Sequence, residues 1–151
     1  MAPDATDDYG RYKIECERLV LAANPRAIVT RLGWQIGDSP GSNTMTDYLA
    51  RQAAANSGRI EASRNWIPSC AMLRSSAAAM ADLLERRSPG IHHLEGNRAG
   101  LSFFDIAQRL AALQGASWTI VSTDAPARDN RMTDPRITMG QVSDALPPAR
   151  S

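Results

Sequence analysis

The sequence predicts an α/β fold for this chain of 151 residues. Two observations carry the prediction. Stretches with helical spacing of apolar residues alternate with short β-branched runs, and Gly, Pro or Asn stands at most boundaries between them. Hydrophobic residues make up 43% and charged residues 22%, which is ordinary for a globular domain with room for one core.

The first predicted helix covers residues 9–23. No Pro or Gly follows Gly10 in this stretch, and it ends at Asn24-Pro25, where the proline disfavours a helical residue before it. Tyr9 and Lys13 are four residues apart, so their side chains point the same way. The apolar residues recur along one face, at Tyr12, Cys16, Leu19, Val20 and Ala23.

The spacing of Tyr9 and Lys13 fits a proton-transfer pair. An ammonium held beside a phenol favours the phenolate, which lets a tyrosine exchange protons near neutral pH. The same spacing is common on helices that have no function, and Glu17 stands one turn after Lys13 as a partner for a surface ion pair. Spacing alone leaves both interpretations open.

The rest of the first half predicts two short strands around a loop and a helix. Thr44 and Asp47 have capping-box spacing at the start of that helix. In order, the elements are a buried strand at residues 26–32, a loop at residues 33–42, a helix from Met45 to about residue 56, a strand at residues 59–63 and an irregular segment at residues 64–71.

The second half predicts further alternation of helices and strands. An apolar stripe of Leu73, Ala77, Met80 and Leu84 defines its first helix. The Asp-, Arg- and Pro-rich residues 123–135 form either an ordered loop over a site or a disordered segment. The regular elements are helices at residues 73–84, 103–113 and 142–146 and strands at residues 91–94 and 117–122.

Charge and cysteine content exclude several classes of function. The net charge of +1 gives no reason to expect nucleic acid or an anionic membrane as partner. Cys16 and Cys70 make neither a disulfide framework nor a metal cluster, and no apolar run approaches a membrane span or the core of a signal peptide. We therefore expect a cytoplasmic protein with reduced cysteines, in which His92 and His93 are structural residues and not metal ligands.

Motifs along nearly the whole chain stand in the order of one known family. Tyr9-Gly10-Arg11-Tyr12-Lys13 stands where that family has Tyr-Gly-x-x-Lys, and Cys16-Glu17 stands where it commonly has Gly-Glu. Residues 30–37 resemble its Arg-Thr-Ser-Trp-Val-Tyr-Gly strand and loop, and Asn43-Thr44-Met45 resembles its Asn-Phe-Val helix start. Residues 90–96 and 101–107 resemble its Gly-Ile-Tyr-His segment and its Ser-x-x-Asp/Glu-Phe-Ala helix, and residues 126–128 and 134–137 stand where it has a Pro-Ala-x-Arg-Pro tail. In this order the chain resembles the C-terminal half of an extended short-chain dehydrogenase/reductase of the dTDP-4-dehydrorhamnose reductase type.

This resemblance implies a fold and a chemistry. Residues 1–42 would be a remnant of the Rossmann-like domain with the Tyr-x-x-x-Lys helix and one core strand, and residues 43–151 a small α/β substrate-binding lobe. Tyr9 would give a proton to the C4 keto oxygen of a nucleotide sugar while NADPH or NADH delivers hydride, and Lys13 would hold the nicotinamide ribose. The resemblance places Arg31, Trp34 and Asn43 at the substrate, although Trp34 fits a core aromatic equally well.

The chain also departs from the family. The Gly-x-x-Gly-x-x-Gly cofactor fingerprint is absent, and the third catalytic hydroxyl would lie upstream of Met1. Residues 70–77 lack the family's Thr and Asp, and Leu32-Gly33 replaces Thr-Ser. We therefore expect a truncated or divergent member that is inactive alone. Three alternatives stay open: a non-catalytic binding or regulatory module, an NAD-dependent sugar-nucleotide epimerase, or a remnant without function.

The missing upstream strands have a physical consequence. The strand at residues 27–32 would lie inside a parallel sheet in full-length relatives, covered on both faces. Without them one edge is uncovered, and an uncovered edge pairs with other chains. We expect self-association or poor solubility of the 151-residue chain.

Overall fold

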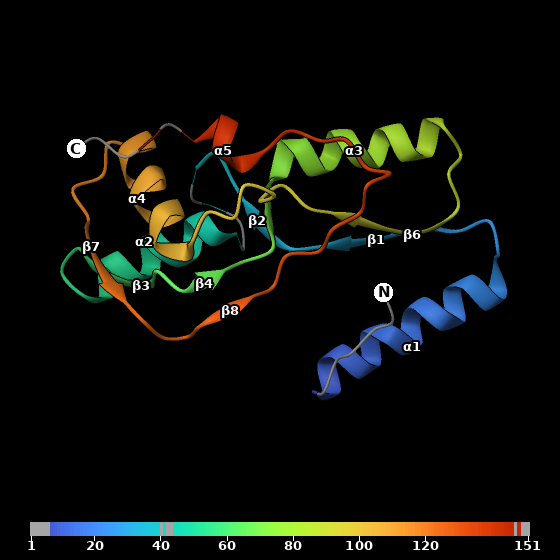
Figure 1. The fold of residues 1–151 in the computed structure, drawn as a ribbon, viewed down its shortest axis with the longest axis horizontal. Coiled ribbons are helices and arrows are strands. Elements are labelled where there is room, and N and C mark those ends of the chain that lie inside the picture. The colour runs from blue at the N-terminus through green and yellow to red at the C-terminus, as the bar shows by residue number, and fades with distance from the viewer. Residues whose placement is uncertain (1–6, 40, 42–43, 147, 149–151) are drawn as a thin grey trace.

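The computed structural model describes residues 7–39, 41, 44–146 and 148. Helices and short strands alternate along this part of the chain (Figure 1). The helices are α1 (Asp8–Ala23), α2 (Met45–Ala55), α3 (Leu73–Glu85), α4 (Phe103–Leu113) and α5 (Val142–Ala145). The strands are β1 (Ile28–Leu32), β2 (Trp34–Ile36), β3 (Arg59–Ser63), β4 (Trp66–Ile67), β5 (Cys70–Met72), β6 (Gly90–Leu94), β7 (Thr119–Thr123) and β8 (Arg128–Asp129).

The strands form parallel pairs that join distant parts of the chain. β1 pairs with β6, β2 with β5, β3 with β7 and β4 with β8. Parallel pairing requires a long crossover, and the helices α2, α3 and α4 lie in these crossovers. The α/β class predicted from the alternation of patterns is confirmed.

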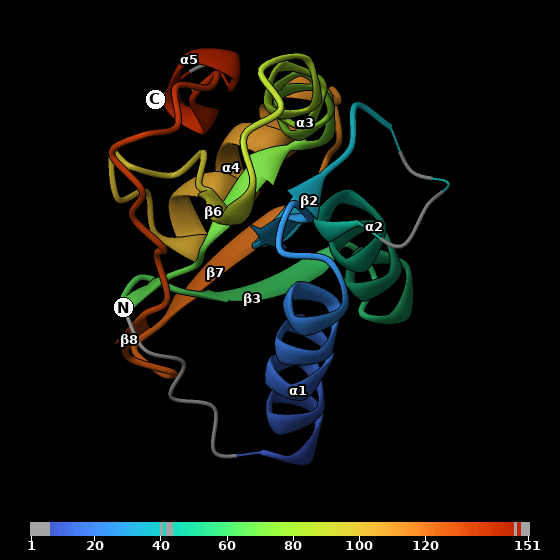
Figure 2. The same ribbon diagram turned by 90° about the vertical axis from the view of Figure 1, so that its right-hand side faces the viewer.

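The pair β1–β6 lies between two helices, with α3 on one side and α1 on the other (Figures 1 and 2). On the α3 side, Ala79 and Leu83 pack with Leu94 and Ile137 in a buried cluster that Ile28 joins. On the other side, none of the sixteen residues of α1 is buried. This small sheet is therefore well covered on one face and loosely covered on the other.

A larger core lies in the rest of the molecule, among α2, α4 and α5 and the strands β2–β5 and β7. From here on we call this group of elements the lobe. Its fully buried residues include Ile36, Met45 and Leu49 from the first half of the chain and Ile106 and Leu110 from α4. Both α2 and α4 begin with a capping box, Thr44 with Asp47 and Ser102 with Asp105, as their spacing predicted. Each helix turns its apolar face onto β3 or β7.

Four strands lie where the sequence predicted loop or irregular structure. β2 lies inside the expected loop at residues 33–42, and β4 lies inside residues 64–71. β5 begins at the end of that irregular segment, and β8 lies inside residues 123–135. These predictions were wrong because such short strands are defined by their partners, β5 for β2 and β8 for β4, and not by a local pattern. A side chain at Gly33 would collide with the backbone of Ser69, so this contact needs a glycine.

The predicted face of α3 was also wrong. Leu73, Met80 and Leu84 are 49%, 38% and 66% exposed, whereas the residues that face the sheet are Ser76, Ala79 and Leu83. Small side chains let the helix approach the strands closely, so the packing face is less hydrophobic than the outer one. The strand at residues 26–32 is likewise only half-buried, and Leu32 at its end is 45% exposed.

The segment after β7 is an ordered loop. Arg98 donates to the carbonyl oxygens of Asp134 and Ile137, and Arg136 donates to the carbonyl oxygen of Ile91. The buried Glu95 carboxylate accepts three backbone N–H groups, from Cys70, Asn97 and Met132. Hydrogen bonds therefore fix the path of this segment from the lobe back to β6. Residues 123–135 are ordered and do not form a disordered segment.

The expected division of the chain at residues 42 and 43 stays a prediction. The elements α3 and β6 follow that boundary in the sequence, but in the structure β6 pairs with β1 and α3 packs on this pair. Within the described part of the chain, every helix is too short or too polar to cross a bilayer.

Candidate functional site

Tyr9 and Lys13 lie together on the first two turns of α1. Asp7 caps the helix by accepting a hydrogen bond from the Gly10 N–H at 2.6 Å. The Lys13 ammonium lies 5.3 Å from the centre of the Tyr9 ring, and Tyr9 is 72% exposed. Tyr9 and Lys13, four residues apart in the sequence, are therefore in contact in the structure. The surface around them is accessible to a ligand or to another protein domain. The catalytic and cofactor-binding roles of the two residues stay predictions.

An ion pair holds α1 against the sheet at the next turn. Arg31 on β1 donates from Nε and Nη2 to the two carboxylate oxygens of Glu17, at 2.9 and 2.7 Å. Both side chains are less than one-fifth exposed. The hydrogen bonds to Arg31 lower the pKa of Glu17, although partial burial opposes the shift. Among the described residues, the ion-pair partner of Glu17 is therefore Arg31 and not Lys13, which contradicts the surface-pair alternative.

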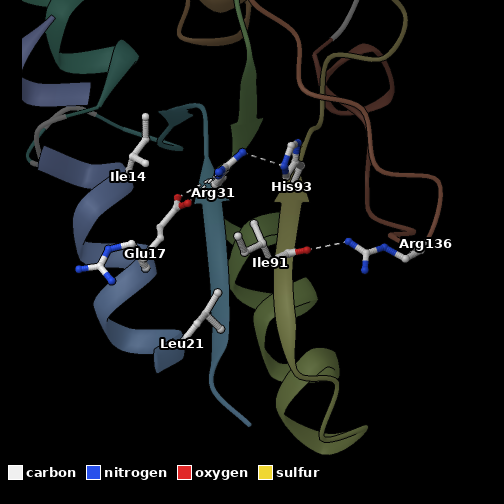
Figure 3. A pocket seen from close by; sticks show the side chains of 8 residues that line it. Ile14, Glu17, Leu21, Arg31, Ile91, His93 and Arg136 are labelled. Carbon is white, nitrogen blue, oxygen red and sulfur yellow. Dashed lines mark hydrogen bonds and ion pairs between the residues drawn. The ribbon is translucent and has the colours of Figure 1, made fainter. Parts of the chain in front are cut away.

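The same arginine lies in a pocket between α1, β1 and β6 (Figure 3). The pocket has a volume of about 320 Å³. Nε2 of His93 lies 3.3 Å from Nη1 of Arg31, and burial together with the Arg31 charge lowers the pKa of His93. The lining residues are Ile14, Glu17, Arg18, Leu21, Arg31, Ile91, His93 and Arg136. The His93 imidazole is therefore mainly neutral near pH 7 and extends the Glu17–Arg31 contact onto β6.

Trp34 belongs to a different environment. Its ring lies edge-on to Tyr48 at 5.1 Å and stacks with Phe103 at 5.9 Å and with Trp66 at 6.2 Å, measured between ring centres. Arg128 covers the Trp66 ring at 4.6 Å. Trp34 is half-buried at the margin of the lobe core, and it does not line the pocket that contains Arg31. The third predicted substrate residue, Asn43, lies outside the described residues.

The two histidines take opposite sides of β6, as their alternation predicted. His92 is buried with Nε2 3.0 Å from the Ser88 carbonyl oxygen, and His93 faces α1. In the part of the chain that the structure describes, no three His, Cys, Asp or Glu side chains are grouped to hold a metal. Cys16 and Cys70 are free thiols.

The contacts of Glu17, Arg31 and His93 were not foreseen from the sequence. Arg31 and His93 are 62 residues apart and meet only because β1 and β6 pair. A local signal does exist for Glu17, since it shares a helix face with Ile14 and Leu21, the two apolar residues of α1 that line the pocket. A carboxylate between two inward apolar residues points to a buried cation partner.

The residues present fit only one end of a nicotinamide dinucleotide. The exposed Tyr9–Lys13 pair offers a hydroxyl and an ammonium for the ribose end. The diphosphate end requires a Gly-rich turn between a strand and a helix, and the sequence has no such fingerprint. The residues present therefore match the ribose end of the cofactor and not its diphosphate end.

Comparisons with known proteins identify the family and the fold of the chain. A family model described as the RmlD substrate binding domain matches residues 2–139. The fold resembles dTDP-4-dehydrorhamnose reductase from Bacillus anthracis in complex with NADP, with 17% identity, a TM-score of 0.69 and coverage of 83% of this chain and 43% of that one. The corresponding reductase from Yersinia enterocolitica is 22% identical with a TM-score of 0.64, covering 87% and 51%.

A related enzyme has the same architecture. The dTDP-glucose 4,6-dehydratase from Bacillus anthracis, solved with NAD, is 15% identical, with a TM-score of 0.61 and coverage of 90% of this chain and 45% of that one. Among curated proteins no sequence matches. The chain has the fold of the C-terminal half of these Rossmann-like proteins, and it spans about half of their length or less.

Proposed function

Because this chain belongs to the RmlD substrate binding domain family, we propose that it is the sugar-nucleotide-binding region of an NAD(P)-dependent 4-keto sugar nucleotide reductase. The observation that carries the proposal is the match over residues 2–139, which includes the Tyr9–Lys13 pair and Trp34 in the order of the family motifs. The contact between Tyr9 and Lys13 on an exposed helix end supports it.

In this proposal the chain supplies proton transfer and substrate contacts. Tyr9 gives its phenolic proton to the C4 oxygen of the sugar, and the Lys13 ammonium stabilises the phenolate that remains. Arg31 has a role in positioning, since its ion pair with Glu17 fixes α1 on the sheet. Trp34, with Tyr48 and Trp66 beside it, offers an aromatic surface to the nucleotide sugar. A reduced nicotinamide, when bound, supplies the hydride.

We propose further that this chain alone does not reduce the sugar. The described residues lack a cradle for the cofactor phosphates, and the similar reductases are about twice as long. Activity then requires a nucleotide-binding half in addition to the residues of this chain. A non-catalytic sugar-nucleotide-binding module is the second candidate, favoured by the same missing cradle and by the altered residues 70–77.

Binding of a dTDP-sugar, measured by calorimetry and by tryptophan fluorescence, tests the proposal. We expect one site per chain, weakened at least tenfold in Trp34→Ala. Trp118→Phe is a matched control, because Trp118 also packs half-buried against the lobe core but lies outside the ring cluster. Absence of any binding by the folded chain, or equal loss in both variants, would contradict a sugar-nucleotide site at Trp34.

NADPH consumption with a dTDP-4-keto-6-deoxy sugar separates the two candidates. For the chain alone we expect no turnover above background. In a longer parent protein with a nucleotide-binding half, Tyr9→Phe should reduce turnover by about 10²–10⁴-fold, because it removes the proton and keeps the ring. A parent that binds the sugar nucleotide but never consumes NADPH would favour the non-catalytic module.

A further inference from the structure

The cavity between α1, β1 and β6, which we call the α1 pocket, does not overlap with the aromatic rings around Trp34 (Figure 3). Its volume of about 320 Å³ is at the lower end of the range of roughly 300–1,000 Å³ that is typical of sites for small molecules. The function proposed above places the nucleotide sugar at Trp34 and assigns no ligand to this pocket.

The lining of the α1 pocket has an excess of positive groups. It contains one carboxylate, that of Glu17, and three guanidinium groups, those of Arg18, Arg31 and Arg136. Arg18 is paired with Glu15 and Arg136 with Asp134. Neither of these two carboxylates lines the pocket, so the cations are gathered at its wall while two of their counterions lie outside it. Such a wall favours an anionic ligand.

Two of the arginines keep hydrogen-bond donors that no described residue uses. Arg18 donates to Glu15 through Nε and Nη2. Arg136 donates through the same two nitrogens, to Asp134 and to the Ile91 carbonyl oxygen. In the described part of the chain, Nη1 of each guanidinium is therefore unused. Hydrogen bonds from a guanidinium to a carboxylate or phosphate are roughly twice as strong as neutral ones.

His93 adds a donor to the same wall. Nε2 of its ring lies 3.3 Å from Nη1 of Arg31. A guanidinium can only donate, so Nε2 is the acceptor and the proton of the neutral imidazole is on Nδ1. Nδ1 is buried and has no hydrogen-bond partner among the described residues. A buried N–H without a partner costs free energy, and an oxygen of a ligand would remove that cost.

The rest of the lining is aliphatic. Ile14 and Leu21 come from α1, and Ile91 comes from β6. An inorganic anion gains nothing from these side chains, because it has no apolar surface to bury. A hydrocarbon chain or ring gains roughly 25 cal/mol for each Å² of apolar surface removed from water. The pocket therefore combines an anion-binding wall with an apolar one.

From these features we propose that the α1 pocket binds a small organic anion, a carboxylate or a phosphate ester that carries an apolar group. Its oxygens accept from the unused N–H groups, and its apolar group lies against the aliphatic side chains. The ligand contacts both α1 and β6, so it holds α1 on the sheet in addition to the Glu17–Arg31 pair. Because α1 carries Tyr9 and Lys13, the anion then regulates their position. This last consequence rests on the proposed function, whereas the binding itself does not.

NMR titrations at constant ionic strength with benzoate, phenyl phosphate, benzamide and inorganic phosphate test the proposal. We expect at least one of the two organic anions to shift the amide signals of α1, β1 and β6 and to leave those of α4 unchanged. Benzamide has the ring without the charge, and inorganic phosphate has the charge without the ring. Both should bind at least tenfold more weakly. Tighter binding of benzoate would identify a carboxylate as the ligand, and tighter binding of phenyl phosphate a phosphate ester.

A pair of variants on α1 locates the site. Arg18 and Arg11 both form pairs with a carboxylate three residues away, and their side chains are 63% and 66% exposed, but only Arg18 lines the pocket. Arg18→Gln should weaken binding of the organic anion at least threefold, and Arg11→Gln should leave it unchanged. In the unmutated protein the bound anion should also slow amide hydrogen exchange throughout α1.

Three results would overturn the proposal. They are the absence of shifts at millimolar concentrations of both organic anions, binding of benzamide or inorganic phosphate as tight as that of the organic anions, and an equal effect of Arg18→Gln and Arg11→Gln. None of these measurements depends on a dTDP-sugar or on turnover. A failure of the proposed function at Trp34 is therefore distinguishable from a failure of the α1 pocket.

Discussion

The helices of the lobe and the helix α1, which lies against β1, differ in how deeply they are buried. Five of the eleven residues of α4 are buried, and α2 buries five of its eleven, whereas α1 buries none of its sixteen. The lobe completes its own core, so its stability comes from apolar burial. The helix α1, by contrast, contacts the sheet through the Glu17–Arg31 ion pair and the partly buried Ile14 and Leu21, and it leaves Tyr9, Tyr12, Leu19 and Val20 exposed. The helices of the lobe are therefore held mainly by apolar burial, and α1 is held mainly by a polar contact.

Truncation of a core leucine should show the largest difference between the regions. Leu110 is 1% exposed and lies among the buried residues of the lobe. Leu110→Ala should lower the free energy of unfolding by about 2–5 kcal/mol, from lost transfer energy and a cavity. Leu19→Ala, at a residue 52% exposed on α1, should change it by less than about 0.5 kcal/mol. Urea unfolding of dilute protein measures both, and equal losses would contradict the division into two regions.

Removal of Arg31 should affect α1 more than the lobe. Arg31→Ala leaves the partly buried Glu17 carboxylate without its partner, at a cost of about 1–2 kcal/mol after allowing for solvent access. Amide hydrogen exchange should then rise throughout α1 and stay unchanged in α4. Arg18→Ala removes an exposed pair with Glu15 and should leave exchange in both helices as it was. Faster exchange in α4 would mean that the regions are coupled.

Acid should release α1 before it unfolds the lobe. Arg31 lowers the pKa of Glu17 from its ordinary value of 4.5, so the folded state binds the proton less well than the unfolded state does. This stabilisation is fully present above the ordinary value and disappears as the pH falls through the lowered pKa. Hydrogen exchange of α1 should increase below about pH 4.5, and Glu17→Gln should abolish that increase. A pH response that persists in Glu17→Gln would assign it to another carboxylate.

Local signals in the sequence predicted local structure well. The capping boxes at Thr44 and Ser102, and the contact of Tyr9 with Lys13, lie within one helical turn, and the structure shows all three. The face of a helix that packs against the sheet could not be predicted from such local patterns. On α1 and α3 the apolar stripe that the spacing indicated is largely exposed. The sheet is met instead by Ile14, Glu17 and Leu21 on α1 and by Ser76, Ala79 and Leu83 on α3.

Sequence patterns could not predict contacts between residues that are far apart in the sequence. Arg31 meets Glu17 and His93 only after β1 pairs with β6, and Trp34 meets Phe103 only after the lobe has formed. The short strand β2 exists because Trp34 lies opposite Cys70 in the ladder. Such features depend on which elements become neighbours, and this requires the fold itself.

The parallel pairing of early strands with late ones also constrains synthesis on the ribosome. Ile28 pairs with Gly90, Arg59 with Thr119 and Trp66 with Arg128. Most strands of the nascent chain are therefore synthesised long before the strands with which they pair. Helices can form while translation continues, but each of these long loops can close only after its second strand has been made, which for β3 and β4 is in the last third of the chain. A product that stops before β7 would leave β3 without its ladder partner, and would be a substrate for chaperones and proteases.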